Sequence, residues 1–201
     1  GQKVVLADLD LGGADVHLYL GVKSLPKTWN DFLDKKVDSI EDIMTPTPYE
    51  GLKLIGGDSS RLGSENLPYS QKRKIIRHLR EMQGDYLILD LGGNSSYNAL
   101  DFFLFADHKI VVSGTEPASI LDSYSFVKVA AYRLLERFFS EHKSLKEFAK
   151  KIKNGSWGQS DGVSLDFIFR EVRERDESAY NKIRHRYDQF CVSLVVNMAE
   201  S

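Results

Sequence analysis

The first apolar run of this sequence leads directly into two carboxylates. Asp8 and Asp10 follow residues 4–7, and Gly12 and Gly13 come soon after them. Side chains two residues apart on an extended segment point the same way. Two like charges held together are costly unless a cation or a polarised water lies beside them. The pattern therefore indicates a cation or water site, although an Asp-x-Asp sequence at a strand end is also an ordinary turn.

A further carboxylate, Asp90, also follows an apolar run, residues 86–89. The loop after it consists of small residues and includes Gly92 and Gly93. An apolar strand, a terminal Asp and a small-residue loop describe a Walker B segment, in which the Asp holds Mg²⁺ and the loop senses the γ-phosphate of a nucleotide. An Asp that caps the following helix is the alternative interpretation.

Five short apolar runs alternate with helical patterns along the chain. This order predicts an α/β fold with a mostly parallel sheet flanked by helices, and the nearly continuous runs are typical of strands covered on both faces. Ligands of open α/β sheets bind at the carboxyl ends of the strands. The runs are residues 4–7, 52–55, 86–89, 109–112 and 193–196, and they end in Asp8 and Asp10, Gly56-Gly57-Asp58, Asp90, Ser113-Gly114 and Asn197.

A helix is predicted over residues 70–82, with Ser70 as its N-cap and Gly84 ending it. An apolar stripe at helical spacing would face the core. The other face carries a basic cluster, which is either a solvated surface or a docking surface for a partner or DNA. The stripe is Ile75, Ile76, Leu79 and Met82, and the basic cluster is Lys72, Arg73, Lys74, Arg77 and Arg80.

Residues 132–190 are predicted to form a helical insertion between two strands of one domain that spans residues 1–201. Basic residues mixed with aromatic ones can indicate contact with nucleic acid. Acidic residues nearly balance the basic ones here, and the aromatic side chains fall at helical spacing, so we expect most of them to form a core between helices. They are Phe138, Phe139, Phe148, Trp157, Phe167, Phe169, Tyr180, Tyr187 and Phe190.

The composition is that of an ordinary globular protein, with 42% hydrophobic and 28% charged residues. A formal charge of −2 provides no overall attraction to nucleic acid or to an anionic membrane. The single cysteine excludes an internal disulfide, and Cys191 is expected to be buried beside a strand. No apolar run reaches the roughly 20 residues that span a bilayer. We therefore expect a cytoplasmic protein, with peripheral membrane attachment left open.

Two long segments resemble the MinD/ParA-type deviant Walker ATPases, also described as CobQ/CobB/MinD/ParA nucleotide-binding domains. Residues 4–21 resemble their switch I segment. Residues 86–120, including Leu100-Asp101-Phe102-Phe103 and Glu116-Pro117, resemble Walker B, switch II and the strand that follows. Val195-Val196-Asn197 resembles the strand whose terminal Asn contacts adenine. The resemblance is greatest to the FlhG-like branch and to MinD-like proteins with a helical insertion.

The resemblance implies binding of ATP and Mg²⁺. Asp10 would position the attacking water, Asp8 would support the metal shell, and Asp90 would be the Walker B carboxylate that holds the metal.

Other implied roles concern the loops and the partners. Gly92 and Gly93 would belong to switch II, and Asn197 would contact the adenine edge. Members of the group form ATP-bound homodimers that act as timers in placing cellular structures, such as flagella or a division site. Self-association and an unidentified protein partner are therefore expected, whereas membrane and DNA binding remain open.

The phosphate-binding loop of the family, Lys-Gly-Gly-x-Gly-Lys-Ser/Thr, precedes the first Asp-x-Asp strand. Only seven residues precede Asp8, and none of them supplies this loop. We therefore expect a truncated chain with little or no ATPase activity by itself. Asp15 stands where the family usually has Asn, and its charge would oppose a nucleotide phosphate. Asn94 stands where the family usually has Gly.

Two other functions are compatible with these residues. A non-catalytic module could use the ATPase core as a scaffold and bind a partner through residues 132–190; the missing loop and Asp15 favour this hypothesis. A biosynthetic ligase of the CobQ/CobB kind shares the nucleotide fold. It normally adds a glutaminase domain with a nucleophilic Cys and a His, which this sequence does not supply.

Overall fold

The computed structural model describes residues 1–57, 67–154 and 164–198. The chain divides into two compact units, Gly1–Ala106 and Asp107–Ser201, and each is described by itself. The prediction of one domain over residues 1–201 stays a prediction. Within the described residues no helix is both long and apolar enough to cross a membrane.

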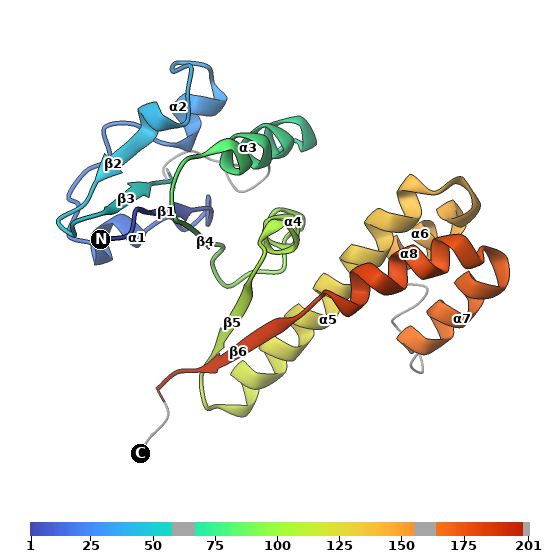
Figure 1. Ribbon diagram of the computed structural model, residues 1–201. Coiled ribbons are helices and arrows are strands. Elements are labelled where there is room, and N and C mark those ends of the chain that lie inside the picture. The colour runs from blue at the N-terminus through green and yellow to red at the C-terminus, as the bar shows by residue number, and fades with distance from the viewer. Residues whose placement is uncertain (58–66, 155–163, 199–201) are drawn as a thin grey trace. The chain divides into compact units, whose positions relative to one another are not determined.

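The first unit is built on a four-stranded sheet with the order β2-β3-β1-β4 (Figure 1). The strands β3, β1 and β4 run parallel, and β2 is antiparallel to β3. The sheet is therefore mostly parallel and flanked by helices, which confirms the predicted fold class. Its elements are β1 (Val4–Asp8), α1 (Val16–Tyr19), α2 (Trp29–Leu33), the 3₁₀ turn η1 (Glu41–Ile43), β2 (Met44–Pro46), β3 (Leu52–Ile55), α3 (Tyr69–Glu81), β4 (Tyr86–Asp90) and α4 (Tyr97–Phe105).

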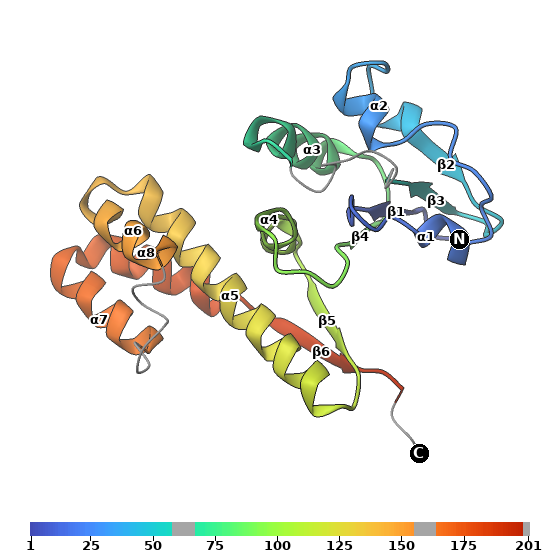
Figure 2. The same ribbon diagram turned by 180° about the vertical axis from the view of Figure 1, so that it is seen from behind.

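The second unit joins a two-stranded parallel sheet to a group of helices (Figure 2). A long helix, α5, follows the first strand, and three shorter helices lead back to the second. The elements are β5 (Lys109–Ser113), α5 (Pro117–Glu141), the 3₁₀ turn η2 (Lys143–Leu145), α6 (Lys146–Lys153), α7 (Leu165–Arg175), α8 (Glu177–Asp188) and β6 (Val192–Val196).

All five predicted strands are confirmed, and the structure adds β2, which sequence periodicity could not reveal because it has only three residues and ends in Pro46. The expectation that every strand is covered on both faces is wrong for three of them. One strand of the first sheet and both strands of the second expose large apolar side chains, namely Tyr86, Ile88, Ile110, Val112, Leu194, Val195 and Val196.

The predicted bounds of α3, about residues 70–82, agree with the structure to within one residue, but the predicted N-cap is wrong. The helix begins at Tyr69, directly after Pro68, so Ser70 lies inside its first turn and does not cap it. Proline fixes φ near −65° and needs no hydrogen-bond acceptor for its nitrogen, so it is well tolerated at a helix start. Ile75 and Leu79 are buried, as the apolar stripe predicts.

Each unit has a hydrophobic core of its own. Trp29, Phe32 and Phe102 are among the fully buried side chains of the first core. The second core lies among the helices of residues 132–190, and it confirms that most of the aromatic residues there pack internally. Its aromatic members are Phe138, Phe139, Phe148 and Phe169, with Tyr132, Tyr180 and Tyr187 packed against them. Trp157 lies outside the described residues.

Two further expectations concern single residues. Cys191 is exposed, so the expectation of a buried thiol is wrong. It lies in the short link between α8 and β6, one residue before the strand begins. Asp58, one of the predicted strand-end carboxylates, lies outside the described residues.

Candidate functional site

The two acidic strand ends of the first unit lie side by side. Strands β1 and β4 pair in parallel register, and Asp8 is the register partner of Asp90. The backbone pairing continues one residue further, because the Leu9 N–H donates to the Asp90 carbonyl at 2.7 Å. The carboxyl ends of the two strands therefore form one acidic edge, where open α/β sheets bind their ligands.

Asp8 is almost completely buried, with 1% of its surface exposed. Its carboxylate accepts the N–H of Asp10 at 3.2 Å and the N–H of Val16 at 3.3 Å. The indole of Trp29 donates to the Asp8 carbonyl oxygen at 2.8 Å. The Asp8 carboxylate thus binds the backbone at both ends of the loop that contains Asp10, and the Trp29 indole binds the backbone at the end of β1.

Burial, together with the negative charges of Asp90 and Asp10, raises the pKa of Asp8 to about 6, although the two backbone N–H groups oppose the shift. The surroundings of Asp8 therefore disfavour its ionised form. A cation at the same edge would stabilise the ionised form and lower the pKa.

Asp10 is enclosed by two glycines. A Cβ atom placed on Gly92 would overlap the Asp10 carboxylate, and one placed on Gly13 would lie 3.0 Å from its Oδ2 atom. Gly92 also has a φ of +66°, which L-residues with side chains rarely adopt. The loop after β4 therefore touches the loop after β1 at a point where only glycine fits.

Asp90 is half-buried at the end of β4, and its Oδ1 atom accepts the N–H of Gly92 at 3.1 Å. Gly93 is exposed, and a Cβ atom there would meet nothing within 4 Å. Asn94 is also exposed, and its side-chain oxygen accepts the N–H of Ser96 at 3.0 Å. The two glycines of the predicted switch segment therefore differ, because Gly92 is sterically required and Gly93 is open.

Mg²⁺ fits this set of donors when a nucleotide supplies the remaining ligands. Within residues 1–57, 67–154 and 164–198, no three His, Cys, Asp or Glu side chains form a group able to hold a metal ion alone. Mg²⁺ is commonly bound by one or two carboxylates together with substrate phosphates and waters. Asp90 and Asp10 are the carboxylates less buried than Asp8, whose two oxygens already accept backbone N–H groups.

Asn197 belongs to the second unit, where it directly follows β6. Its N–H donates to the Ser113 carbonyl at 2.8 Å, and its side-chain oxygen accepts the N–H of Met198 at 2.9 Å. The residue is exposed and lies at the carboxyl ends of β5 and β6, as a strand-end ligand of a parallel sheet must. Asp15, in the first unit, is exposed immediately before α1.

One buried pair of opposite charges in the first unit was not predicted from the sequence. Lys72 on α3 and Asp101 on α4 form an ion pair, and both side chains are less than a tenth exposed. Two signals in the sequence could have revealed it. Lys72 lies three and seven residues before the apolar positions Ile75 and Leu79, and Asp101 interrupts an otherwise apolar run.

The basic cluster of α3 is therefore only partly a solvated face. Lys72 is buried, and Lys74 donates to the Phe32 carbonyl at 2.6 Å while its ammonium lies 3.8 Å from the centre of the Phe32 ring. Burial, with the nearby charges of Lys35 and Arg77, lowers the pKa of Lys74. Two of the five cluster residues thus serve the fold, and Arg73, Arg77 and Arg80 are exposed.

No protein-family model matches the chain. Individual proteins and solved structures are nevertheless similar to it. The flagellum site-determining protein YlxH of Helicobacter pylori is 29% identical over 134 residues, covering 64% of this chain and 44% of that protein. The antiactivator FleN of Pseudomonas aeruginosa is 25% identical over 131 residues, covering 64% and 46%. The chain therefore spans about half the length of the curated relatives it matches.

Solved structures agree with the fold. The septum site-determining protein MinD of Pyrococcus horikoshii, complexed with Mg-ADP, has a TM-score of 0.52 at 18% identity and covers 93% of this chain and 82% of its own. The cell division ATPase MinD of Pyrococcus furiosus has a TM-score of 0.52 at 20% identity, covering 64% and 54%. The chain has the fold of a MinD/ParA-type P-loop ATPase. Within that fold class its relatives in sequence include the flagellum site-determining protein YlxH, the antiactivator FleN and the septum site-determining protein MinD.

Proposed function

We propose that this chain carries the metal-binding and switch part of an ATP-dependent spatial regulator. The observation that supports this most directly is the contact between the two acidic loops: Asp10 packs against Gly92 while Asp8 and Asp90 are register partners. In such an arrangement, a ligand that moves one loop must also move the other. This is the property that a nucleotide-dependent switch requires.

The proposed roles follow from exposure and position. Asp90 would hold Mg²⁺, which neutralises phosphate charge when it is bound with the nucleotide. Asp10 is positioned to orient a water, because Gly13 and Gly92 fix its carboxylate. Asp8 positions the loop of Asp10 through two backbone hydrogen bonds.

Gly92 and Gly93 would form the mobile part of the switch, and Asn197 would contact the adenine edge. Its exposed amide at the end of a parallel strand is suited to hydrogen bonds with a base. The proposal includes an ATP-bound homodimer and a role in placing flagella or another cellular structure. The supporting comparison is that YlxH is named as a flagellum site-determining protein and MinD as a septum site-determining protein.

Binding of Mg·ATP to the full-length protein that contains residues 1–201 tests this proposal. Titration calorimetry would compare the unaltered protein with Asp90→Ala and Asp10→Ala. We expect Asp90→Ala to weaken Mg·ATP binding by roughly tenfold or more, because one charged metal ligand is lost. Asp10→Ala should keep binding and lose hydrolysis by roughly 10²-fold.

Asp122→Ala serves as the matched control, because Asp122 is exposed on α5 and the substitution removes the same charge. It should change neither binding nor hydrolysis. Absence of Mg·ATP binding by the unaltered full-length protein would refute the proposal.

A non-catalytic partner-binding module is the second candidate. The exposed carboxylate of Asp15 supports it, because a negative charge beside a phosphate opposes nucleotide binding. The helices of residues 132–190 have a core of their own and could present a surface to a partner. Asp15→Asn separates the two candidates: it should strengthen Mg·ATP binding several-fold in a nucleotide switch and have no effect in a module that binds no nucleotide.

A further inference from the structure

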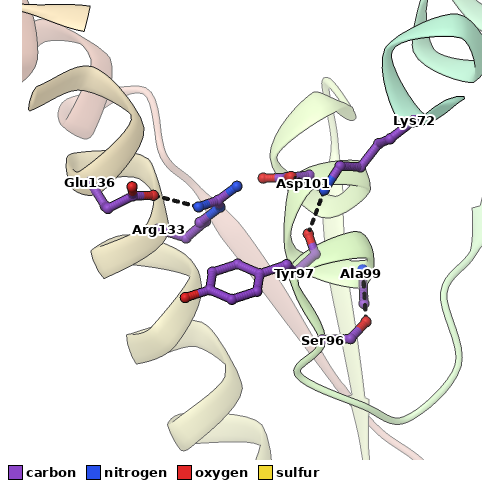
Figure 3. Close-up of polar contacts among 7 residues, drawn as sticks. All are labelled: Lys72, Ser96, Tyr97, Ala99, Asp101, Arg133 and Glu136. Carbon is purple, nitrogen blue, oxygen red and sulfur yellow. Dashed lines mark hydrogen bonds and ion pairs between the residues drawn. The ribbon is translucent and has the colours of Figure 1, made fainter. Parts of the chain in front are cut away.

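The ion pair between Lys72 and Asp101 joins α3 to α4, the helix that follows the loop after Asp90. Lys72 projects from α3 toward α4 (Figure 3), and its side chain is 7% exposed, while that of Asp101 is 4% exposed. Lys72 lies in line with the apolar positions Ile75 and Leu79 of its helix, and Asp101 interrupts an apolar run. A fully paired arrangement is required there, because an unpaired buried charge is strongly destabilising.

Lys72 also reaches a second point on α4. Its ammonium donates to the Tyr97 carbonyl at 3.4 Å, four residues before Asp101 (Figure 3). Residues four apart lie one above the other on a helix face. A single ammonium therefore contacts α4 at two points about one turn apart, which fixes the rotation of α4 about its axis as well as its distance from α3.

The helix α4 begins directly after residues 91–96, the loop that follows Asp90. Ser96 caps it by accepting the N–H of Ala99 at 3.2 Å (Figure 3). The side-chain oxygen of Asn94 in turn accepts the N–H of Ser96 at 3.0 Å. The other end of the loop is anchored by Asp90, which is paired to β1. Residues 91–95 thus span two anchors, and the position of the second anchor depends on where α4 is held.

An ion pair is not the most stabilising choice for this site. Taking two charges out of water costs much of what their attraction returns, and a well-packed apolar pair of similar volume is often as stable or more so. The ion pair instead fixes the orientation of α4, because the Lys72 ammonium must contact both the Asp101 carboxylate and the Tyr97 carbonyl. Apolar contacts would allow α4 to slide or rotate.

We propose that Lys72 and Asp101 are positioning residues, whose ion pair fixes α4 and thereby the geometry of residues 91–96 against Asp10. This inference deepens the proposed nucleotide switch and depends on it only for the kinetic part of its test. A looser α4 would leave Gly92 free to move away from the Asp10 carboxylate, and a catalytic carboxylate displaced by about 1 Å can cost up to roughly 10²-fold in rate.

The test uses the full-length protein with the single variant Lys72→Met and the double variant Lys72→Met/Asp101→Leu. The double variant replaces the ion pair by an apolar contact, so its melting temperature should be close to that of the unaltered protein. Lys36→Met is the matched control, because Lys36 forms an exposed ion pair with Asp31 at 2.9 Å in the same unit. Lys72→Arg tests whether a conservative cation restores function.

Hydrogen exchange of the amides of residues 91–100, without nucleotide, is the first measurement. We expect exchange about tenfold faster in the double variant than in the unaltered protein, and no change in Lys36→Met. Equal protection in the double variant and the unaltered protein would overturn the inference, since the ion pair would then be only one way to fill the space.

Steady-state ATP hydrolysis is the second measurement. The double variant should lose roughly tenfold in kcat with KM changed less than about twofold, and Lys72→Arg should recover part of the loss. A double variant with both normal stability and normal kcat would contradict the positioning role. If the unaltered protein bound no Mg·ATP, the proposed function would fail while hydrogen exchange would still decide whether the ion pair positions α4.

Discussion

The Asp10 carboxylate lies against the α-carbon of Gly92, so that the loops after two neighbouring strands meet at a glycine. This contact requires that residue 92 have no side chain and that it adopt a φ of +66°. Gly93, one position later, has no such constraint. The pair offers an internal comparison in which the chemical change is identical and the surroundings differ.

Gly92→Ala should lower the free energy of unfolding by about 1–3 kcal/mol, because the new methyl group meets the Asp10 carboxylate in a backbone conformation that alanine disfavours. Gly93→Ala should change it by less than about 0.5 kcal/mol. Urea denaturation followed by circular dichroism measures both values. Equal effects of the two substitutions would show that the close approach of Gly92 to Asp10 does not exist in solution.

The second prediction concerns Asp31, which accepts the N–H of Thr28 at 3.0 Å at the start of α2 and pairs with Lys36 at 2.9 Å. The hydrogen bond from Lys36, and then that from Thr28, hold the pKa of Asp31 below its ordinary value of 3.8. A lowered pKa in the folded state means that the carboxylate stabilises the fold above pH 3.8 and that this contribution is lost as the pH falls further.

Asp31→Asn should therefore cost about 1 kcal/mol at pH 7, and the difference from the unaltered protein should shrink below pH 4. Urea denaturation at pH 7, 5 and 3 gives the comparison. A penalty that stays constant down to pH 3 would mean that the charge of Asp31 contributes nothing.

The third prediction separates buried from surface aromatic residues in the helices of the second unit. Phe139 has no exposed surface, whereas Phe167 is 37% exposed and lies beneath the Arg170 guanidinium at 5.2 Å. Phe139→Ala should cost about 3–5 kcal/mol through loss of buried surface and creation of a cavity. Phe167→Ala should cost less than about 1 kcal/mol.

Hydrogen exchange resolves where each change acts. Protection in Phe139→Ala should fall in α5 to α8 and remain in β1 and β3, which belong to the separate core of the first unit. A uniform loss throughout both units would show that the two cores unfold together.

The fourth prediction uses the single thiol. Because Cys191 is exposed, an aromatic disulfide reagent should label one thiol per chain in the native protein at close to the rate seen in urea. A labelling rate at least about 10³-fold slower in the native protein would indicate a buried thiol, because reaction would then wait for the chain to open.

Much of the fold could be predicted because apolar runs and their endings are local features. Residues 4–7 predict a strand that ends at the carboxylates Asp8 and Asp10, and β1 extends from Val4 to Asp8. Parallel packing then places the ends of different strands at one edge without further information. That rule places Asp8 and Asp90 at the same edge of the sheet, whereas their side-by-side position depends on the pairing of β1 with β4, which only the structure gives.

Contacts between segments far apart in sequence could not be predicted. The burial of Lys72 depends on Asp101, which lies on another helix, and a basic residue among others on α3 resembles a solvated one. The requirement for Gly92 depends on where the Asp10 side chain points. Cys191 lies between Phe190 and the apolar run of β6 in sequence, but its side chain is exposed.

The helix α5 runs without interruption through 25 residues, which makes it about 37 Å long. Its first turn is fastened to the end of β5, where Ser119 accepts the N–H of Gly114 at 2.8 Å and its hydroxyl lies 3.1 Å from that of Ser113. Its last turns carry Leu135, Phe138 and Phe139 into the helical core. A tilt of about 5° at Ser119 would swing the far end by about 3 Å. Because of the length of α5, a small change in its direction at the end of β5 would become a displacement of several ångströms at the helical core.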